Sequence, residues 1–433
     1  MESPPKISAT AGTGRLRTRR TGAAWPPELA ERIGLFLAGS ALPFALVLYL
    51  ALKGGGYDGI VRSEVGIAVW WIVLLGAVVG ILPLARVRAA GWVALGLLAA
   101  FAGWTALGIT WSESAERSVV ELARVLTYLG VLTLALLVQG RGGLRRTVNA
   151  LALALALVAL LALLSRLHPA WFPDSDTLQF LPDQAGRLNY PLNYWNGLAA
   201  LIGMGIPLVL VVAVTSRRLL TQALATAALP AAVLAAFLTY SRGGAAAIVA
   251  GLLVFIALYP RRLEILPTVS LSAVGGVLLV AAATQRDALE AGPVGAAAHS
   301  QGDEMLAMVL VVCAGMGLLR IAVGLAARHG IGPRLGRPSG RQAGWAVVGV
   351  VVAGLVLAVA AGLPGELSDR WEEFKQPATP AGSAERFESA GGSGRYQWWG
   401  TALDAFRAEP VTGIGPGTYE FFWAREGTIP GFV

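Results

Sequence analysis

Charged residues, cysteine and histidine are all scarce in this sequence, and each shortage excludes a class of protein. Charged residues make up 14% of the 433 positions, whereas a soluble domain carries roughly a quarter. A water-exposed surface around the whole chain is therefore not expected. The single cysteine, Cys313, lies inside an apolar run and excludes internal disulfides and thiolate metal sites. His168, His299 and His329 stand alone and form no metal-ligand spacing. We expect neither a metal ion nor another cofactor.

Long hydrophobic runs dominate what is present. Hydrophobic residues form 55% of the chain, and they recur in runs of about twenty, the length of a helix that crosses a bilayer. The pattern predicts an all-α fold, a polytopic transmembrane helical bundle within residues 34–363. A disordered basic tail at 1–33 precedes it, and a segment of mixed charge at 364–433 follows. About 11 helices are expected, at residues 34–52, 66–84, 90–110, 118–139, 147–164, 197–215, 219–239, 243–259, 265–284, 305–327 and 343–363.

The distribution of Lys and Arg orients the predicted bundle. With the N-terminus in the cytoplasm, the inside segments carry 19 basic residues and the outside loops before residue 364 carry 7. Because basic residues favour the cytoplasmic side, we expect a multi-pass protein of the inner (plasma) membrane, with 364–433 as a large extracytoplasmic loop. The net charge of +8 then reflects topology. Membrane lipids are expected partners, and nucleic acid is not.

Ionisable side chains are almost absent from the predicted spans. Arg124, with Glu121 one turn before it, and Arg320 lie toward helix ends, and no acidic residue lies at the centre of a span. Ion-coupled carriers need ionisable groups near the middle of the membrane, so this class is disfavoured. A flippase or exporter of lipid-linked glycans stays an alternative, and it should line a transmembrane path with charge.

Polar residues gather instead on the predicted outer face, where three arginines occur at Arg187, Arg242 and Arg395. A planar guanidinium binds two phosphate oxygens at once, so these residues suit a diphosphate. Amide, hydroxyl and aromatic groups beside them suit a sugar: Tyr190, Asn193, Tyr194, Asn196 and Ser241. A plainer interpretation also stands, in which the arginines anchor helix ends and the aromatic residues form an interfacial belt.

The last segment holds two further patterns. Residues 395–409 predict an amphipathic helix whose apolar face combines Trp398, Trp399, Ala402, Leu403 and Phe406. Such a helix is compatible with a position on the bilayer surface and with direct contact to a substrate. The glycine-rich residues 413–417 follow no strand pattern and contain Pro416, so they indicate a turn and not a dinucleotide-binding loop.

Three stretches together resemble the O-antigen ligase and polymerase superfamily of membrane glycosyltransferases: RLNYPLNYWNGLA at 187–199, LTYSRGGAAA at 238–247 and RYQWWGTALDAFRAEPVTGIGPGTY at 395–419. Residues 111–124 are similar to the family's fourth-helix entry. The resemblance implies a GT-C-like bundle that uses an undecaprenyl-diphosphate-linked glycan as donor and needs no metal. By motif, it implies that Arg187 and Arg242 grip the diphosphate as catalytic residues and that Arg395 and Arg124 bind substrate.

The predicted function is transfer of a glycan from this donor, with inversion, to a glycan, lipid or protein acceptor at the outer face of the inner membrane. The family's candidate base is a histidine in the large loop, so we expect the chain to continue past Val433 with such a histidine and a further span. A wall polymerase of the cell-shape and division class is an alternative, and it would be expected to need an acidic residue in its large loop.

Overall fold

The structure, a computed structural model, describes residues 34–80, 82, 87–138, 143–173, 184, 186–260, 262–291, 296–329, 363–377 and 389–429. This part of the chain contains helices and connections but no strand. Two short elements, η1 and η2, flank α2, and a third, η3, follows α6. The helices and their bounds are η1 Leu37–Ala41, α2 Leu42–Leu52, η2 Gly54–Gly56, α3 Gly59–Val79, α4 Ala89–Gly108, α5 Ala115–Val138, α6 Gly143–Leu167, η3 Pro169–Trp171, α8 Trp195–Thr215, α9 Leu219–Leu238, α10 Arg242–Leu258, α11 Arg262–Ala283, α12 Asp287–Ala291, α13 Ala296–Arg328, α15 Leu363–Lys375, α17 Arg395–Ala408 and α18 Tyr419–Glu426.

Within the described residues, nine helices are long and apolar enough to cross a membrane. The helix α10 is also apolar but shorter, with 17 residues. The predicted all-α, multi-pass architecture is confirmed at this level. The predicted tail at 1–33 and the predicted helix at 343–363 lie outside the described residues. The GT-C class and the orientation in the membrane stay predictions.

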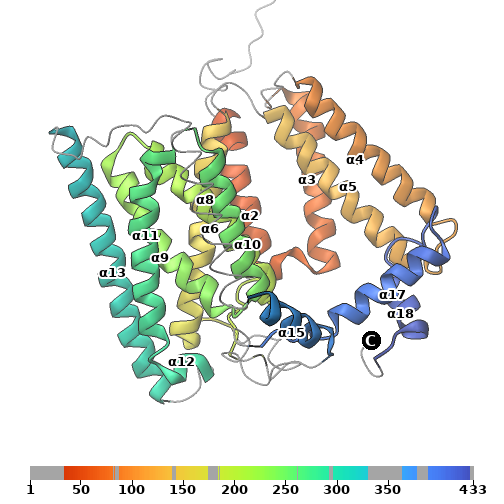
Figure 1. Cartoon of the computed structure of the whole chain (residues 1–433). Coiled ribbons are helices and arrows are strands. Elements are labelled where there is room, and N and C mark those ends of the chain that lie inside the picture. The colour runs from red at the N-terminus through yellow and green to blue at the C-terminus, as the bar shows by residue number, and fades with distance from the viewer. Residues whose placement is uncertain are drawn as a thin grey trace, which may run out of the picture.

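The spanning helices pack in two groups, which Figure 1 shows side by side. The larger group joins α6, α8, α9, α11 and α13 around side chains that are almost fully buried: Leu163, Leu198, Leu229, Leu234, Leu279 and Met305. In lipid, helices associate through close contact at small residues. A Cβ on Gly205 would lie only 2.9 Å from Leu155, so the two helices α6 and α8 meet at that glycine. Helices α2 and α10 pack on this group, at α6 and α8, and the smaller group consists of α3, α4 and α5. A cluster of apolar side chains around Val65, Val69 and Leu134 lies where α2 faces α3 and α5.

The predicted helix at 66–84 was placed too late in the sequence. Helix α3 begins at Gly59 because the carboxylate of Asp58 accepts hydrogen bonds from the backbone N–H groups of Ile60 and Val61, at 2.8 and 3.1 Å. It ends at Gly80, whose left-handed backbone terminates the helix. Glu64 therefore lies inside a spanning helix, whereas the predicted bounds put it in a loop.

Helix α13 also begins earlier in the sequence than predicted. Helix α13 has 33 residues, about 50 Å at 1.5 Å per residue, so it extends well beyond the predicted 305–327. The amphipathic helix expected at 395–409 is confirmed as α17. Helices α12, α15 and α18 were not predicted.

One end of the bundle carries most of the polar connections. Residues 186–194, the turn 239–241, α12, α15, α17 and α18 lie there (Figure 1), and we call it the polar end. Helix α18 and the segment before it dock on the connection between α4 and α5 and on the first turn of α5. The indole of Trp111 donates to the carbonyl of Thr412 at 3.2 Å, and Arg117 pairs with Glu420 at 2.9 Å. The 413–417 turn is confirmed there, with Ser118 donating to the Pro416 carbonyl at 2.8 Å.

The polar end is predicted to be extracytoplasmic, and cysteine labelling tests this. Val411 is 81% exposed at the polar end, and Arg217 is exposed in the connection between α8 and α9 at the opposite end. In a Cys313→Ala background, a membrane-impermeant maleimide should label Val411→Cys in intact cells and Arg217→Cys only after permeabilisation. The reverse pattern would invert the topology.

Candidate functional site

Arg187 is the most completely enclosed of the predicted site arginines. Only 5% of its surface is exposed. Its guanidinium donates to the backbone carbonyls of Thr239 at 2.9 Å and Tyr240 at 3.1 Å, and it stacks on the ring of Trp195 at 4.4 Å. The next residue, Leu188, donates its N–H to the carbonyl of Leu238 at 2.8 Å. This segment therefore binds the carbonyl groups at the end of α9, which have no partner within that helix.

A hydrogen-bonded group connects Arg187 to the start of α10. The side-chain oxygen of Asn196 accepts from the Arg187 guanidinium at 3.4 Å and from the Ser241 hydroxyl at 2.7 Å. Ser241 in turn accepts from the N–H of Gly244 at 3.1 Å and caps α10. The amide of Asn196 donates to the hydroxyl of Tyr194 at 3.1 Å. Four predicted site residues are thus joined in one network.

The second arginine, Arg242, lies beyond this network and meets Arg395. Arg242 donates to the Gly391 carbonyl at 2.7 Å across 149 positions of sequence, and Arg395 donates to the next carbonyl, of Gly392, at 3.5 Å. The two guanidinium groups are close enough for their charges to repel, and Glu373 is close enough to attract Arg242. Both arginines are half-buried, and each is the first residue of a helix.

Glu373 on α15 holds the backbone that carries those carbonyls. One of its oxygens accepts from the Ser389 hydroxyl at 2.9 Å and from the Ala390 N–H at 2.8 Å. These hydrogen bonds lower the pKa of Glu373, so the group stays ionised at neutral pH. Glu373 is not among the predicted site residues, because no helix was predicted at the position of α15. The spacing of Leu367, Trp371 and Phe374 at i, i+4 and i+7 was the available signal for that helix.

The remaining predicted residues are distributed more widely. Tyr190 packs edge-on against Phe172 with ring centroids 5.1 Å apart, and Asn193 adopts a left-handed backbone at φ 56°. Arg124 pairs with Glu121 on α5 at 2.8 Å. Within the described residues, no contact joins Arg124 to Arg187 or Arg242. The structure therefore brings together Arg187, Tyr194, Asn196 and Ser241 in one network and Arg242 and Arg395 beside it, and it leaves Arg124 apart.

The described residues contain no group of three His, Cys, Asp or Glu side chains that could hold a metal ion. Comparison of the chain with family models, with curated proteins and with solved structures found no match.

Two neighbouring glycines test the packing behind Arg242. A Cβ added at Gly244 would collide with the Cβ of Ala199 on α8, whereas a Cβ at Gly243 would meet nothing within 4 Å. Gly244→Ala should therefore lower the free energy of unfolding by about 1–3 kcal/mol through overpacking. Gly243→Ala should be neutral or stabilising, since alanine favours the helix. Thermal unfolding of the two purified variants gives the comparison, and equal midpoints would contradict this packing.

Proposed function

We propose that this protein is an O-antigen ligase-like membrane glycosyltransferase that moves a glycan from an undecaprenyl-diphosphate donor to an acceptor at the outer face of the inner membrane. The observation that carries the proposal is the convergence of Arg242 and Arg395 on adjacent carbonyls at the polar end. Two like charges held close together are unfavourable without compensation. Glu373 supplies one negative charge against two positive ones, and a bound diphosphate would supply the rest.

The two arginines retain the capacity to bind such a group. A guanidinium has five N–H donors. Within the described residues, Arg242 and Arg395 each use one guanidinium nitrogen to donate to a glycine carbonyl. Both residues also begin a helix, and helix N-termini favour anions through their free N–H groups and the helix dipole. A diphosphate between them would meet two planar cations and two helix ends.

In the proposed reaction, an acceptor hydroxyl attacks the anomeric carbon on the face opposite the diphosphate. The new C–O bond forms as the bond from that carbon to the diphosphate oxygen breaks, and the diphosphate leaves with the electron pair. The hydroxyl proton passes to a base, a role for which the resemblance implies a histidine of the large loop. Arg242 stabilises the negative charge that develops on the leaving oxygen.

Arg187 has a different role in this proposal from the one that the resemblance implies. Its guanidinium binds protein carbonyls and is buried, so it acts as a positioning residue that fixes the turn before Arg242. Tyr194 is 52% exposed beside the network, and its ring offers an apolar face for a sugar. Asn196 and Ser241 orient these groups.

Substitution of Arg242 tests the proposal in the full-length protein. Lysine keeps the charge but loses the planar fork, so Arg242→Lys and Arg242→Ala should both lower glycan transfer on the order of a hundredfold or more. The measurement is consumption of lipid-linked donor in membrane vesicles that contain equal amounts of protein.

Arg407 provides the matched control for this experiment. It lies in the last turn of α17, is well exposed, and pairs with Asp404 at 2.8 Å. Arg407→Lys should leave transfer unchanged. Near-normal transfer by Arg242→Lys would contradict the proposal and assign Arg242 to anchoring α10 at the membrane surface.

A further inference from the structure

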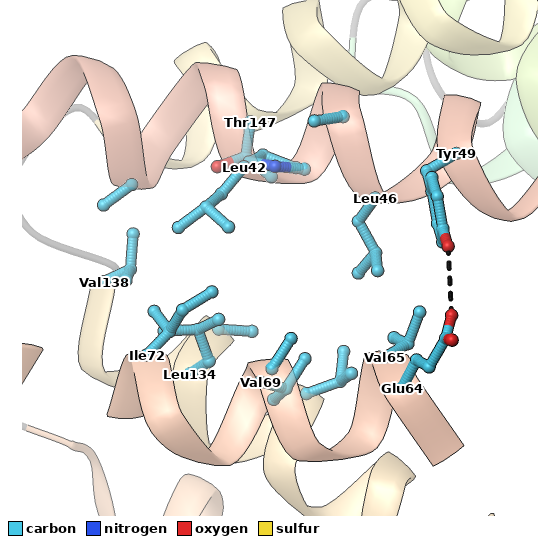
Figure 2. Close-up of a pocket in the computed structure, with 16 residues that line it drawn as sticks. Leu42, Leu46, Tyr49, Glu64, Val65, Val69, Ile72, Leu134, Val138 and Thr147 are labelled. Carbon is cyan, nitrogen blue, oxygen red and sulfur yellow. Dashed lines mark hydrogen bonds between the residues drawn. The ribbon is translucent and has the colours of Figure 1, made fainter. Parts of the chain in front are cut away.

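A groove of about 450 Å³ separates α2 from α3, with α5 and the start of α6 forming its other walls. Figure 2 shows apolar side chains from α2, α3 and α5 pointing into this space, among them Leu42, Leu46, Val69, Ile72 and Leu134. Its walls belong to helices long and apolar enough to cross a membrane. The groove therefore faces the depth of the bilayer that holds hydrocarbon chains.

The groove has one polar end. There the hydroxyl of Tyr49 donates to the carboxylate of Glu64 at 3.4 Å (Figure 2). Among the described residues that line the groove, Glu64 is the one that carries a charge. It lies five positions after the start of α3, about 7.5 Å along the helix axis at 1.5 Å per residue. At this depth a carboxylate lies near the boundary between headgroups and hydrocarbon.

The mouth of the groove adjoins the segment that contains Arg187. A Cβ on Gly54 would lie 3.6 Å from the side-chain nitrogen of Asn193, and one on Gly55 would lie 3.4 Å from Leu192. The connection between α2 and α3 is thus packed on the polar end, and Glu64 lies on the same side of the bundle as the candidate site.

The size of the groove fits one hydrocarbon chain. An apolar protein cavity of about 150 Å³ accepts benzene, which has six carbons. A space three times as large has room on the order of eighteen carbons. The groove is also open toward the surroundings of the bundle, since Ala45 and Ala68 in its walls are exposed.

The carboxylate of Glu64 at the mouth of the groove determines which lipid headgroup fits there. A carboxylate repels a purely anionic headgroup and forms strong hydrogen bonds with an ammonium group. A basic residue, Lys53, directly follows α2, one turn beyond Tyr49, and it provides a cation at the same end for a lipid phosphate. Arg62, in the first turn of α3, adds a second cation at this end, and Asp58 adds a second carboxylate. The charges therefore balance, which matches a zwitterionic lipid with an N–H-bearing ammonium group.

We propose that this groove is a binding site for one zwitterionic lipid with a primary ammonium headgroup, whose chain occupies the space between α2 and α3 and whose ammonium donates to Glu64. The site is separate from the two arginines and does not depend on the glycosyltransferase proposal. It assigns a role to Glu64, an acidic residue in a spanning helix that neither the network around Arg187 nor the pair of arginines uses.

Native mass spectrometry of the delipidated, purified protein tests this site with three lipids of equal chain length. Phosphatidylethanolamine should be retained as one molecule per chain, about tenfold better than phosphatidylcholine, whose headgroup has no N–H donor. Phosphatidylglycerol, which is anionic, should bind more weakly than phosphatidylethanolamine. Equal retention of the three lipids, or tightest retention of phosphatidylglycerol, would overturn the proposal.

Substitutions separate the headgroup contact from the chain contact. Glu64→Gln should abolish the preference for phosphatidylethanolamine, while Ala68→Trp, which fills the groove, should abolish retention of every lipid. Ala77→Trp is the matched control, because Ala77 is an exposed residue of α3 that does not line the groove. If Glu64→Gln does not fold, the Ala68→Trp and Ala77→Trp pair decides the result. Equal lipid retention by that pair would show that the groove is not the site.

Discussion

The carbonyl groups at the end of α9 need hydrogen-bond donors, and the arrangement of the rest of the polar end depends on which groups donate to them. A helix leaves its last carbonyls without partners, and in a membrane protein such groups are costly unless the protein itself binds them. Here the N–H of Leu188 and the guanidinium of Arg187 bind the carbonyls of residues 238–240. The turn held in this way is only three residues long and leads directly into α10. The direction of α10, and with it the position of Arg242, follows from that contact.

Arg187 and Arg242 show why the sequence could not separate scaffold from site. Both are arginines in stretches rich in hydrogen-bonding residues on the predicted outer face, and both occur in motifs that resemble the same family. Their difference is tertiary: one is 5% exposed and bonded to carbonyls 52 and 53 positions away, and the other is half-buried beside a second cation. No local pattern records which carbonyl a side chain will reach. The convergence of Arg242 with Arg395 is hidden from the sequence for the same reason.

The helices themselves could largely be predicted, because long apolar runs have few alternatives in a membrane. Errors arose where polar residues belong to a helix. The first turns of α3 contain the polar residues Arg62, Ser63 and Glu64. Because these residues precede the apolar run, the helix was predicted to start after them. The Asp58 cap was a readable signal for the true start. Helix α15 was not predicted because it is short and rich in charged residues. Its aromatic residues pack on α17, a tertiary contact that no local pattern records.

The segment from 389 to 426 is attached at both ends to different helix groups. Arg242 of α10 binds it at Gly391. At the other end, Trp111 and Glu113 of the connection between α4 and α5 bind it together with Arg117 of α5. The segment therefore links the two groups. Helices α2 and α3, whose separation forms the groove, lie on either side of the gap that this segment bridges (Figure 1). Since Arg395 belongs to this segment, one of the two paired cations is carried by the piece of chain that joins the helix groups, and the other, Arg242, by one of the groups themselves.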